Sequence, residues 1–451
     1  MRHTSPESTR HVLVWLVLAV FVSYANTLTG SFQFDDFNVI VNEAQVHSWS
    51  NWYATLGNGI RPLLKLSYTA NWTMGLGVIG FHLTNMLIHL LNTYLVYRLS
   101  QLFVQQQTRS AALRHVPLLA ALLFAVHPIH TEAVSYISGR SASLMALLYL
   151  AALLSYVMGR TQHKPLYVTV FTPLLFVLAL AVKETAVTLP FALLLWEVSF
   201  GGRWRLALKP QWTSWLVLTI AAVFFLLSNS YLSQMERSAG LNSIEGNLAT
   251  QLAGFVYLLQ QFALPLCLNI DPDLPLLHNL AEAALPIAIT VALLGLMVAC
   301  WRRRPWISFT LGWAMLHLIP LYVPLPRIDI ANERQLYLAT WPLLLALSIE
   351  LTFLLEGWKW RSVAAGLLIT CIALTVTRNQ VYRNEITLWE DTVAKSPNKA
   401  RVHNNLGYAY LLAQRKEEAR RELTIALQLD PNLYQAQYNL RRLDEEVISS
   451  P

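Results

Sequence analysis

The sequence predicts an all-α polytopic membrane protein with about eleven transmembrane helices and a short helical-repeat tail. Of the 451 residues, 55% are hydrophobic and only 13% are charged, whereas an ordinary soluble domain carries about 25% charged residues. The hydrophobic residues come in runs of about 17–25, which are long enough to cross a bilayer. This composition excludes a soluble globular enzyme for most of the chain. It also excludes disorder, which requires low hydrophobicity and high charge.

Eleven apolar runs predict the spans, and they are taken here in chain order. They cover residues 12–29, 81–103, 113–130, 141–158, 166–182, 185–200, 213–232, 283–301, 306–323, 338–355 and 362–377. The first run follows eleven mostly polar residues and lacks a small-residue cleavage site, so it is interpreted as a retained span rather than a signal peptide. A twelfth apolar stretch, 250–266, contains three glutamines and Pro265 and is interpreted as an interfacial or re-entrant helix.

The lysines and arginines predict the orientation, because cytoplasmic loops carry an excess of them. With residues 1–11 in the cytoplasm, the cytoplasmic segments hold Arg2, Arg10, Arg109, Arg114, Arg160, Lys164, Arg203, Arg205, Lys209, Arg302, Arg303, Arg304, Lys359 and Arg361. The longer outward segments hold Arg61, Lys65, Arg140, Lys183, Arg237, Arg327 and Arg334. The loop 30–80 and the tail 378–451 therefore face outward. In a bacterium this side is the periplasm and the membrane is the inner membrane; in a eukaryote it is the lumen of the endoplasmic reticulum.

Charge and cysteine content exclude two further classes. The net charge of +7 comes from short basic clusters between apolar runs, so we expect no nucleic-acid partner. The three cysteines, Cys267, Cys300 and Cys371, are far apart in sequence and form no CxxC pair. Neither a disulfide framework nor a zinc site is indicated.

The tail is polar and helical in period. Residues 400–433 match one tetratricopeptide unit at Ala400, Leu406, Gly407, Tyr410, Ala419, Leu423, Ala426 and Pro431. Gly407 is expected to let the two helices approach closely, with Ala419 at their crossing. His403 replaces the usual Trp and Gln414 replaces the usual turn Gly. Two or fewer repeat units cannot bury a solenoid core by themselves. We therefore expect the tail to pack on the membrane domain or on a partner.

Candidate site residues gather on the outward side, at the ends of the spans. They are Asp35, Asp36, Arg61, His127, His130, Arg140, Lys183, Glu184, Glu333 and Arg334. Ionisable residues at membrane depth are costly and are functional candidates by default. Structural alternatives stay open: the acidic pair as a helix cap, Lys183–Glu184 and Glu333–Arg334 as local ion pairs, and His82 and His89 as core histidines. His127, His130 and Glu132 have spacing that could also hold a metal, but contact with structure or phosphate is favoured and no metal is expected.

One carboxylate with several cations suits transfer of a sugar from a lipid phosphate. A carboxylate can take the proton of a hydroxyl acceptor, and fixed positive charge can stabilise the phosphate as it departs. Adjacent residues of an extended loop point to opposite sides. Only one of Asp35 and Asp36 is therefore expected to be the base, while the other orients a loop or the acceptor.

Six segments together resemble the transmembrane and tetratricopeptide-repeat O-mannosyltransferases of the GT-C superfamily. They are FDDFNVIVNE (34–43), RPL (61–63), FHLTNMLIHLLN (81–92), HPIHTEAVSYISGR (127–140), KETAVTLP (183–190) and NERQLYLA (332–339). The resemblance spans residues 12–431, nearly the whole chain. It implies a GT-C-like domain over 12–377, a polyprenyl- or dolichyl-phosphate hexose donor such as mannose, inversion at C1 and no essential metal or cofactor. It also assigns Asp35–Asp36 to the acidic pair and the other candidates to phosphate binding or architecture.

Two departures bear on the acceptor. The family tends to have an acid two residues after Gly139-Arg140, where this chain has Ala142. The tail is also far shorter than the long repeat arrays of eukaryotic members. The acceptor is therefore either a protein Ser/Thr or an envelope glycan or lipid, and the tail is the candidate segment for holding it. Two other functions are weighed: a flippase or transporter for a lipid-linked glycan, and a non-catalytic repeat-bearing scaffold. The span interiors are nearly free of charge, which disfavours a transport pathway, and eleven spans exceed what an anchor needs.

Overall fold

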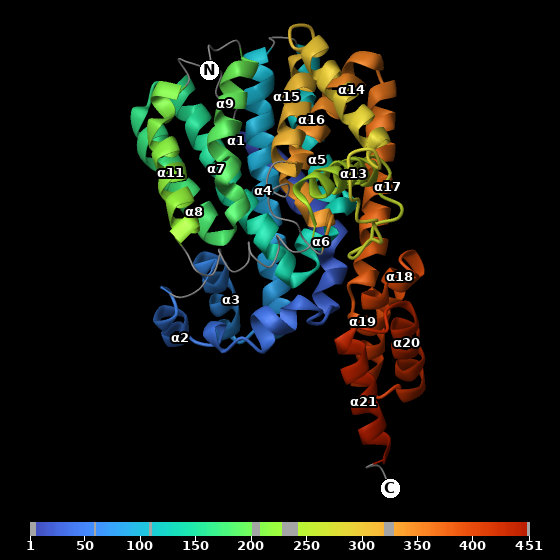
Figure 1. Cartoon of the computed structure of the whole chain (residues 1–451). Helices are drawn as coiled ribbons and strands as arrows, with labels where there is room; N and C mark the ends of the chain where they lie inside the picture. Colours follow the sequence, from blue (N-terminus) through green and yellow to red (C-terminus); the bar gives the residue numbers. More distant parts are fainter. Residues whose placement is uncertain are drawn as a thin grey trace.

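The computed structural model describes residues 6–57, 60–107, 111–200, 208–227, 242–319 and 329–448, and all regular secondary structure in this part of the chain is helical, with no strand. The longer helices of the body are α1 (Pro6–Tyr24), α4 (Gly77–Gln107), α5 (Val116–Val126), α7 (Arg140–Thr161), α8 (Thr172–Val182), α9 (Leu189–Ser199), α11 (Trp212–Leu227), α13 (Ile244–Ala263), α14 (Ala284–Cys300), α15 (Pro305–Leu318), α16 (Leu336–Leu354) and α17 (Lys359–Val381). Most of them run side by side in one upright bundle (Figure 1).

Short helices lie in the segments between the long ones. They are η1 (Ala25–Thr29), η2 (Phe37–Val41), η3 (Ala44–Val46), α2 (Trp49–Ala54), α3 (Pro62–Met74), η4 (Ala111–His115), η5 (Pro128–His130), α6 (Thr131–Val134), η6 (Ile137–Gly139), η7 (Tyr167–Phe171), η8 (Glu184–Thr188), η9 (Lys209–Gln211) and η10 (Glu333–Gln335). The tail forms α18 (Glu385–Lys395), α19 (Ala400–Leu412), α20 (Lys416–Leu429) and α21 (Tyr434–Ile448).

Each of the eleven predicted spans coincides with a helix, although the number of spans stays a prediction. Within the described residues, five helical stretches are long and apolar enough to cross a membrane, and a sixth candidate is the pair Leu113–Val126 and Pro128–Val134, bent by 52°. The predicted runs 213–232 and 306–323 extend past the described residues. Six of the arginines used to predict the orientation lie outside the described residues: Arg2, Arg109, Arg203, Arg205, Arg237 and Arg327. The stretch 250–266 lies mostly in α13, and its interfacial position remains untested.

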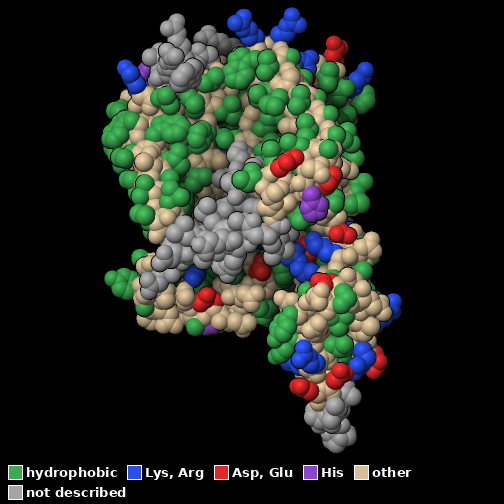
Figure 2. Space-filling view, in the orientation of Figure 1, with side chains coloured by type: hydrophobic (Ala, Val, Ile, Leu, Met, Phe, Trp, Pro, Cys, Tyr) green, Lys and Arg blue, Asp and Glu red, His purple; other side chains and the backbone are tan. Residues whose placement is uncertain are grey.

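Large apolar side chains cover the outside of the bundle, as expected for an integral membrane protein. Trp15 of α1 is 57% exposed and Leu227 of α11 is 75% exposed. Figure 2 shows hydrophobic side chains over the flank of the body, with Lys and Arg side chains along its upper edge. A contiguous apolar surface of this kind is costly in water and favourable in lipid.

The loop 30–80 and the tail lie at the same end of the bundle, and α1 begins at the opposite end (Figure 1). This arrangement agrees with the relative placement that the cation pattern predicts. Helix α17 runs the full height of the bundle and leads directly into α18, whose start is fixed by a capping box between Asn384 and Thr387. The tail is therefore joined to the bundle by a continuous helix and a tight, capped turn.

The tail packs on the membrane domain, as its small size predicts. One hydrophobic cluster joins Trp389, Leu406 and other tail residues to Tyr136 and Ile270 of the body. Within the repeat, Ala419 is fully buried at the crossing of α19 and α20. Gln414, at the position usually held by glycine, adopts a φ of 60°, so the turn keeps its left-handed conformation at some cost.

Gly407 is predicted to tolerate no side chain. A Cβ at this position would lie 2.7 Å from Cγ of Leu423 and 3.2 Å from its backbone nitrogen. We expect Gly407→Ala to lower the free energy of unfolding of the tail by about 1–3 kcal/mol, the usual cost of overpacking. Hydrogen exchange of α19 and α20 in the full chain measures this loss. The matched control is Gly366→Ala in α17, where an added Cβ meets nothing within 4 Å. Equal protection in both variants would contradict close packing at Gly407.

Candidate active site

The acidic pair lies in a sharply turned loop after η1, and the turn sends the two carboxylates to different places. Phe34, directly before the pair, has a φ of 47°. This left-handed conformation costs a non-glycine residue about 1–3 kcal/mol and persists only when its surroundings hold it. The backbone N–H of Phe34 donates to Oε1 of Glu385 at 2.9 Å, and its ring packs edge-on against Trp389.

Asp36 has a structural role. It is 1% exposed, and its carboxylate accepts bonds from the backbone N–H of Ser138 (2.8 Å), the hydroxyl of Ser138 and the backbone N–H of Gln33 (3.0 Å). These bonds tie the loop to the turn before α7. Asp36 does not line the adjacent cavity. The pair is therefore not a helix cap, because the Asp36 side chain makes no capping bond to η2.

Asp35 lines a cavity of about 320 Å³ that four basic side chains share. The lining residues are Asp35, Val39, Glu43, Ile60, Arg61, Leu64, Lys65, Tyr68, Ser138, Ser141, Lys183, Asn332, Arg334 and Gln335. They come from the loop 30–80, the start of α7, the turn before η8 and the turn at η10. The sequence motifs, which are far apart in the chain, thus meet in one pocket.

Burial dominates the electrostatics of Asp35. Burial raises the pKa of its carboxyl above the ordinary value, Arg334 acts in the opposite direction, and Asp329 adds to the rise. Its backbone N–H donates to the hydroxyl of Tyr136 at 3.0 Å. A carboxylate with a raised pKa is a stronger base than a free one, which suits a proton acceptor near neutral pH.

Arg61 is held in place by Glu184. Two parallel bonds join them, from Nη2 to Oε1 at 2.7 Å and from Nε to Oε2 at 3.0 Å. Burial acts to raise the pKa of Glu184, but the Arg61 guanidinium and other bonds outweigh it and lower that pKa to about 2. Glu184 therefore stays ionised and orients the guanidinium at the cavity wall, which is a common use of bidentate pairing.

Arg334 and Lys183 complete the basic wall. Arg334 is fixed by Glu132, which accepts its backbone N–H at 2.9 Å and lies 3.3 Å from its Nε. Lys183 is 7% exposed and lines both this cavity and a smaller neighbouring one. The local ion pair between Glu333 and Arg334, which the sequence left open as an alternative, does not form. Arg334 pairs with Glu132, and Glu333 pairs with Arg378.

Six predicted site residues do not line the cavity: Asp36 and Glu184, described above, and Arg140, His127, His130 and Glu333. Buried Arg140 donates to Oδ1 of Asn85 (2.6 Å) and to the carbonyls of Phe81 (3.0 Å) and Ser67 (3.1 Å). Its guanidinium thus joins α3 and α4 to α7. Of the two roles that the resemblance implies for Arg140, phosphate binding or architecture, this geometry favours architecture. The physical reason is geometry: helix α7 begins at Arg140 and turns the side chain into the bundle.

The two histidines are also structural in this arrangement. His130 is fully buried between the carbonyl of Phe124 and the hydroxyl of Thr340. His127 accepts from the N–H of Ile129 and stacks on Phe262. His89 bonds the carbonyl of Ala125 and the hydroxyl of Tyr337, as a core histidine does. The described residues include no group of three or more His, Cys, Asp or Glu that could hold a metal.

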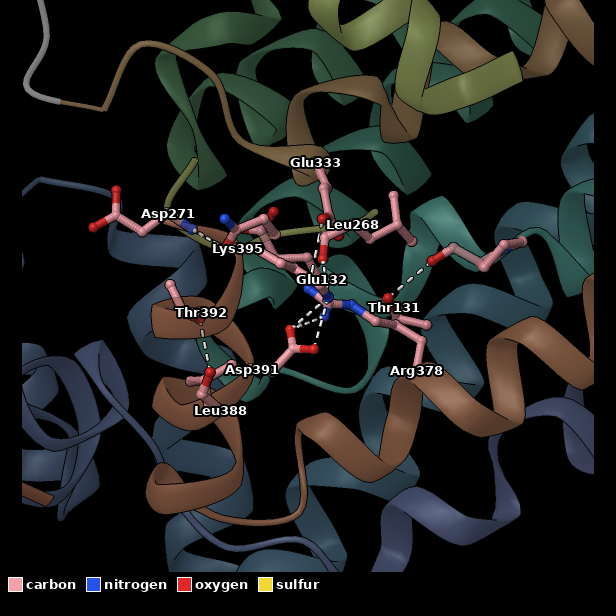
Figure 3. A network of polar contacts seen from close by, with 12 residues as sticks. Thr131, Glu132, Leu268, Asp271, Glu333, Arg378, Leu388, Asp391, Thr392 and Lys395 are labelled. Carbon is pink, nitrogen blue, oxygen red and sulfur yellow. Dashed lines mark hydrogen bonds and ion pairs between the residues drawn. The ribbon is translucent and has the colours of Figure 1, made fainter. Parts of the chain in front are cut away.

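Glu333 belongs to a buried ion network beneath the cavity. Figure 3 shows Arg378 at the end of α17 between Glu333 and Asp391, with Lys395 reaching toward Leu268. Arg378 lies 3.5 Å from Glu333 and 2.6 Å from Asp391. This network joins η10 to α17 and α18, so Glu333 acts through the placement of its neighbour Arg334 rather than in the cavity.

Several cavity residues were not singled out from the sequence as site residues. They are Glu43, Lys65, Tyr68, Ser138, Ser141, Asn332 and Gln335. Lys65, Tyr68 and Asn332 lie within or beside the polar motifs, and that proximity was the available signal. Ser138 and Ser141 flank Gly139-Arg140, but a serine in a turn carries no chemical signature of its own.

Comparison with known proteins finds one family model and several relatives that match this chain. Residues 400–433 match the tetratricopeptide-repeat family model. A Caenorhabditis elegans protein named protein O-mannosyl-transferase F38B6.6 is 24% identical over 94% of this chain and 64% of its own length. Drosophila melanogaster protein O-mannosyl-transferase Tmtc3 is 25% identical over 92% of this chain and 54% of its own. Human TMTC4 is 34% identical over 32% of this chain and 23% of its own.

Curated homologues of this chain are protein O-mannosyl-transferases of the TMTC type. The chain spans 64% of the worm relative and 54% of the fly relative. No solved structure matches it. The alignments with the worm and fly relatives each cover more than nine-tenths of this chain.

The buried Asp36 predicts a pH dependence of stability. Burial raises its pKa to about 7, although its bonds to Ser138 and Gln33 favour the ionised form. The folded state therefore binds this proton more tightly than the unfolded state. The resulting stabilisation is fully present below the ordinary pKa of 3.8 and is lost as the pH rises through about 7.

We expect the melting temperature of the wild type to fall between about pH 5 and about pH 8 by more than that of Asp36→Asn, which cannot titrate. Scanning fluorimetry of the full chain across this range measures the difference. Asp273→Asn, at an exposed position outside the cavity, should keep the wild-type slope. An unchanged slope in Asp36→Asn would assign the titration to another group.

Proposed function

We propose that this protein transfers a hexose, mannose or a similar sugar, from a polyprenyl-phosphate donor to a hydroxyl acceptor on the outer side of the membrane. The observation that carries the proposal is the cavity that Asp35 shares with Arg61, Lys65, Lys183 and Arg334. The other acid in its lining, Glu43, lies 4.0 Å from Lys65. The names of the homologues support the sugar and the reaction class. The polar cavity at the end of an apolar bundle supports a donor that is partly lipid.

In the proposed step, Asp35 takes the proton of the acceptor hydroxyl as its oxygen forms a bond to C1 of the sugar. The bond from C1 to the phosphate oxygen breaks on the opposite face, so the configuration at C1 inverts. The bond's electron pair leaves with the polyprenyl phosphate. No acid is needed on the leaving group, because a phosphate departs as an anion.

Arg61, Lys183 and Arg334 would stabilise the charge that develops on the leaving phosphate. Charges fixed in advance act strongly in a buried site, because no reorganisation is required during the reaction. Glu184 fixes Arg61 and Glu132 fixes Arg334. Glu132 and Glu184 are therefore positioning residues. The reaction as proposed requires no metal and no cofactor.

The chain contributes few repeat units for acceptor binding. One full repeat is matched, with a helix before it and one after it. We propose a hydroxyl acceptor held between the tail and the cavity, either a Ser/Thr of a protein, as the homologue names indicate, or an envelope glycan. The proposed orientation places the cavity and the tail in the periplasm if the source is bacterial, and the N-terminus in the cytoplasm.

A cavity lined by Asp35 and several cations favours an enzyme over a scaffold, because a scaffold has no use for a buried carboxylate beside basic groups. Transport of a lipid-linked glycan would require a polar path through the bundle. The buried polar side chains of the bundle interior, such as His89, Asn92 and His130, are instead hydrogen-bonded to backbone carbonyls or to other side chains. No observation favours transport.

The direct test is transfer of radiolabelled sugar by the purified full chain with a panel of polyprenyl-phosphate donors. Asp35→Asn should lower the rate by about 100-fold or more, the usual contribution of a general base, without changing the melting temperature. Asp273→Asn makes the same chemical change at an exposed position outside the cavity and should retain full activity. Equal activity of the two variants would show that Asp35 is not the base.

A further inference from the structure

We propose that α18, the first helix of the tail, holds the candidate base in place, so that transfer requires a docked tail. This inference rests on the proposed function and adds a regulation of the same site. Its central observation is the left-handed Phe34, next to Asp35 in the chain. Glu385 of α18 accepts the Phe34 N–H at 2.9 Å, and Trp389 of α18 contacts the Phe34 ring with centroids 5.1 Å apart.

The rest of the loop is tied to the tail in the same way. Ser31 N–H donates to the carbonyl of Arg383 at 3.0 Å, and the side-chain amide of Gln33 donates to the carbonyl of Tyr382. Tyr136, which accepts the Asp35 N–H, stacks beside Tyr382 at 6.4 Å. The residues just before the acidic pair are thus bonded mainly to the segment that joins α17 to α18.

The tail is in turn fixed to the bundle by charge. Figure 3 shows Asp391 of α18 facing Arg378, and Lys395 donates to the carbonyl of Leu268 at 2.8 Å. Farther along the tail, Arg401 pairs with Asp271 at 2.5 Å and with Asp329 at 2.6 Å. These contacts make the position of α18 depend on the same turns that carry Arg334. Displacement of α18 would release Phe34 to an extended conformation and turn Asp35 out of the cavity.

The test compares Glu385→Ala and Glu385→Asp, which remove or shorten the acceptor, with Glu385→Gln, whose amide oxygen can still accept the Phe34 N–H. In the full chain, we expect the first two variants to lower kcat about tenfold, the loss expected for one hydrogen bond to a charged group, with the KM for donor nearly unchanged. The Gln variant should keep most of the activity. The matched control is Glu418→Ala, because Glu418 is an exposed residue of α20 that pairs with Arg415.

A second substitution distinguishes loss of the left-handed Phe34 conformation from a general loss of protein stability. Glycine adopts a positive φ without cost, so Phe34→Gly in the Glu385→Ala background should recover part of the lost rate. Hydrogen exchange of residues 31–37 provides a readout that needs no activity. Exchange should accelerate in Glu385→Ala and Glu385→Asp but not in Glu385→Gln or Glu418→Ala.

The outcomes distinguish this inference from the proposed function. Wild-type exchange and wild-type kcat in both Glu385→Ala and Glu385→Asp would overturn the positioning role, even if Asp35 proves to be the base. Accelerated exchange in a protein that transfers no sugar would overturn the proposed function and leave the mechanical coupling established.

A second inference comes from an independent feature, an apolar groove on the outer surface of the bundle. Its volume is about 710 Å³, and it lies between α1, α5 and α17. The lining residues are Trp15, Leu18, Ala19, Val22, Leu118, Leu122, Val126, Arg361, Leu368 and Ile372. Arg361 is the one charged residue among them. We infer that an anionic phospholipid binds here, with its acyl chain in the groove and its phosphate at Arg361.

The polar end of the groove carries more than one cation. Arg361 lies over the ring of Trp360 at 5.5 Å, and Trp360 lies 5.9 Å from the ring of His115. The exposed Arg114 donates to that histidine at 2.8 Å. Two arginines therefore flank the point at which the apolar lining ends, and this complementarity favours an anionic headgroup over a zwitterionic one.

The position of this end argues against the sugar donor as the occupant. Arg361 and Arg378 lie near opposite ends of α17, about 25 Å apart at 1.5 Å per residue. This is close to the thickness of the hydrocarbon core of a bilayer. The phosphate of a lipid bound at Arg361 would thus lie one membrane thickness from the Asp35 cavity, in the opposite leaflet.

The test reconstitutes the full chain in nanodiscs with equal phosphatidylglycerol and phosphatidylcholine, extracts it in detergent and quantifies the retained lipid by mass spectrometry. The wild type should retain phosphatidylglycerol preferentially. Arg361→Gln and Arg114→Gln should each reduce that preference about fivefold, as expected for one basic residue at a charged lipid. Ala19→Trp should fill the groove and lower retention of both lipids. Arg302→Gln, an exposed basic residue outside the groove, should behave as wild type.

Equal retention of both lipids by the wild type, or undiminished preference in the Arg114 and Arg361 double variant, would overturn the inference. Because the measurement does not involve sugar transfer, it is independent of the proposed function.

Discussion

The geometry of the candidate site depends on one constrained residue, Phe34. Its left-handed backbone turns the chain so that consecutive carboxylates serve different purposes, Asp35 at the cavity and Asp36 in a buried set of hydrogen bonds. A bulky residue adopts this conformation only when its surroundings compensate the strain. Here the compensation comes from Glu385 and Trp389, which lie about 350 residues away in sequence. A local feature of the loop is therefore stabilised by the most distant part of the chain.

Around the cavity, basic side chains are likewise held by residues that are far away in sequence. Each of two basic wall residues, Arg61 and Arg334, has a carboxylate partner behind it, Glu184 and Glu132. Leaving a buried charge without a partner is strongly destabilising, so the partners keep the cations ionised and fixed. These two compensating carboxylates lie outside the set that lines the cavity, whose lining combines four basic side chains with two acids, Asp35 and Glu43. This separation makes the arrangement suited to a departing phosphate.

The sequence predicted much of this arrangement and missed some of it for identifiable reasons. Motif order indicated that the acidic pair, Arg61, Lys183 and Arg334 belong together, and the cavity brings Asp35 of that pair together with the three cations. For Arg140 and His130 the sequence left phosphate binding and architecture open, and their polar atoms bond to backbone and side chains of α4, α5 and α16. A buried structural cation and a catalytic one have the same sequence signature. The local Glu333–Arg334 pair was one alternative that the sequence left open, and only the structure shows that Arg334 pairs with Glu132 and Glu333 with Arg378.

The amino-acid sequence by itself determined the helical class, the positions of the apolar helices, the repeat in the tail and the close approach at Gly407. Those properties follow from composition, periodicity and residue size, which act locally along the chain. Only the tertiary structure decided which of Asp35 and Asp36 faces the cavity. It also decided which basic side chains line the cavity beside that residue. The direction of a side chain in a loop depends on backbone angles that remote contacts impose, and no local pattern in the sequence records those contacts.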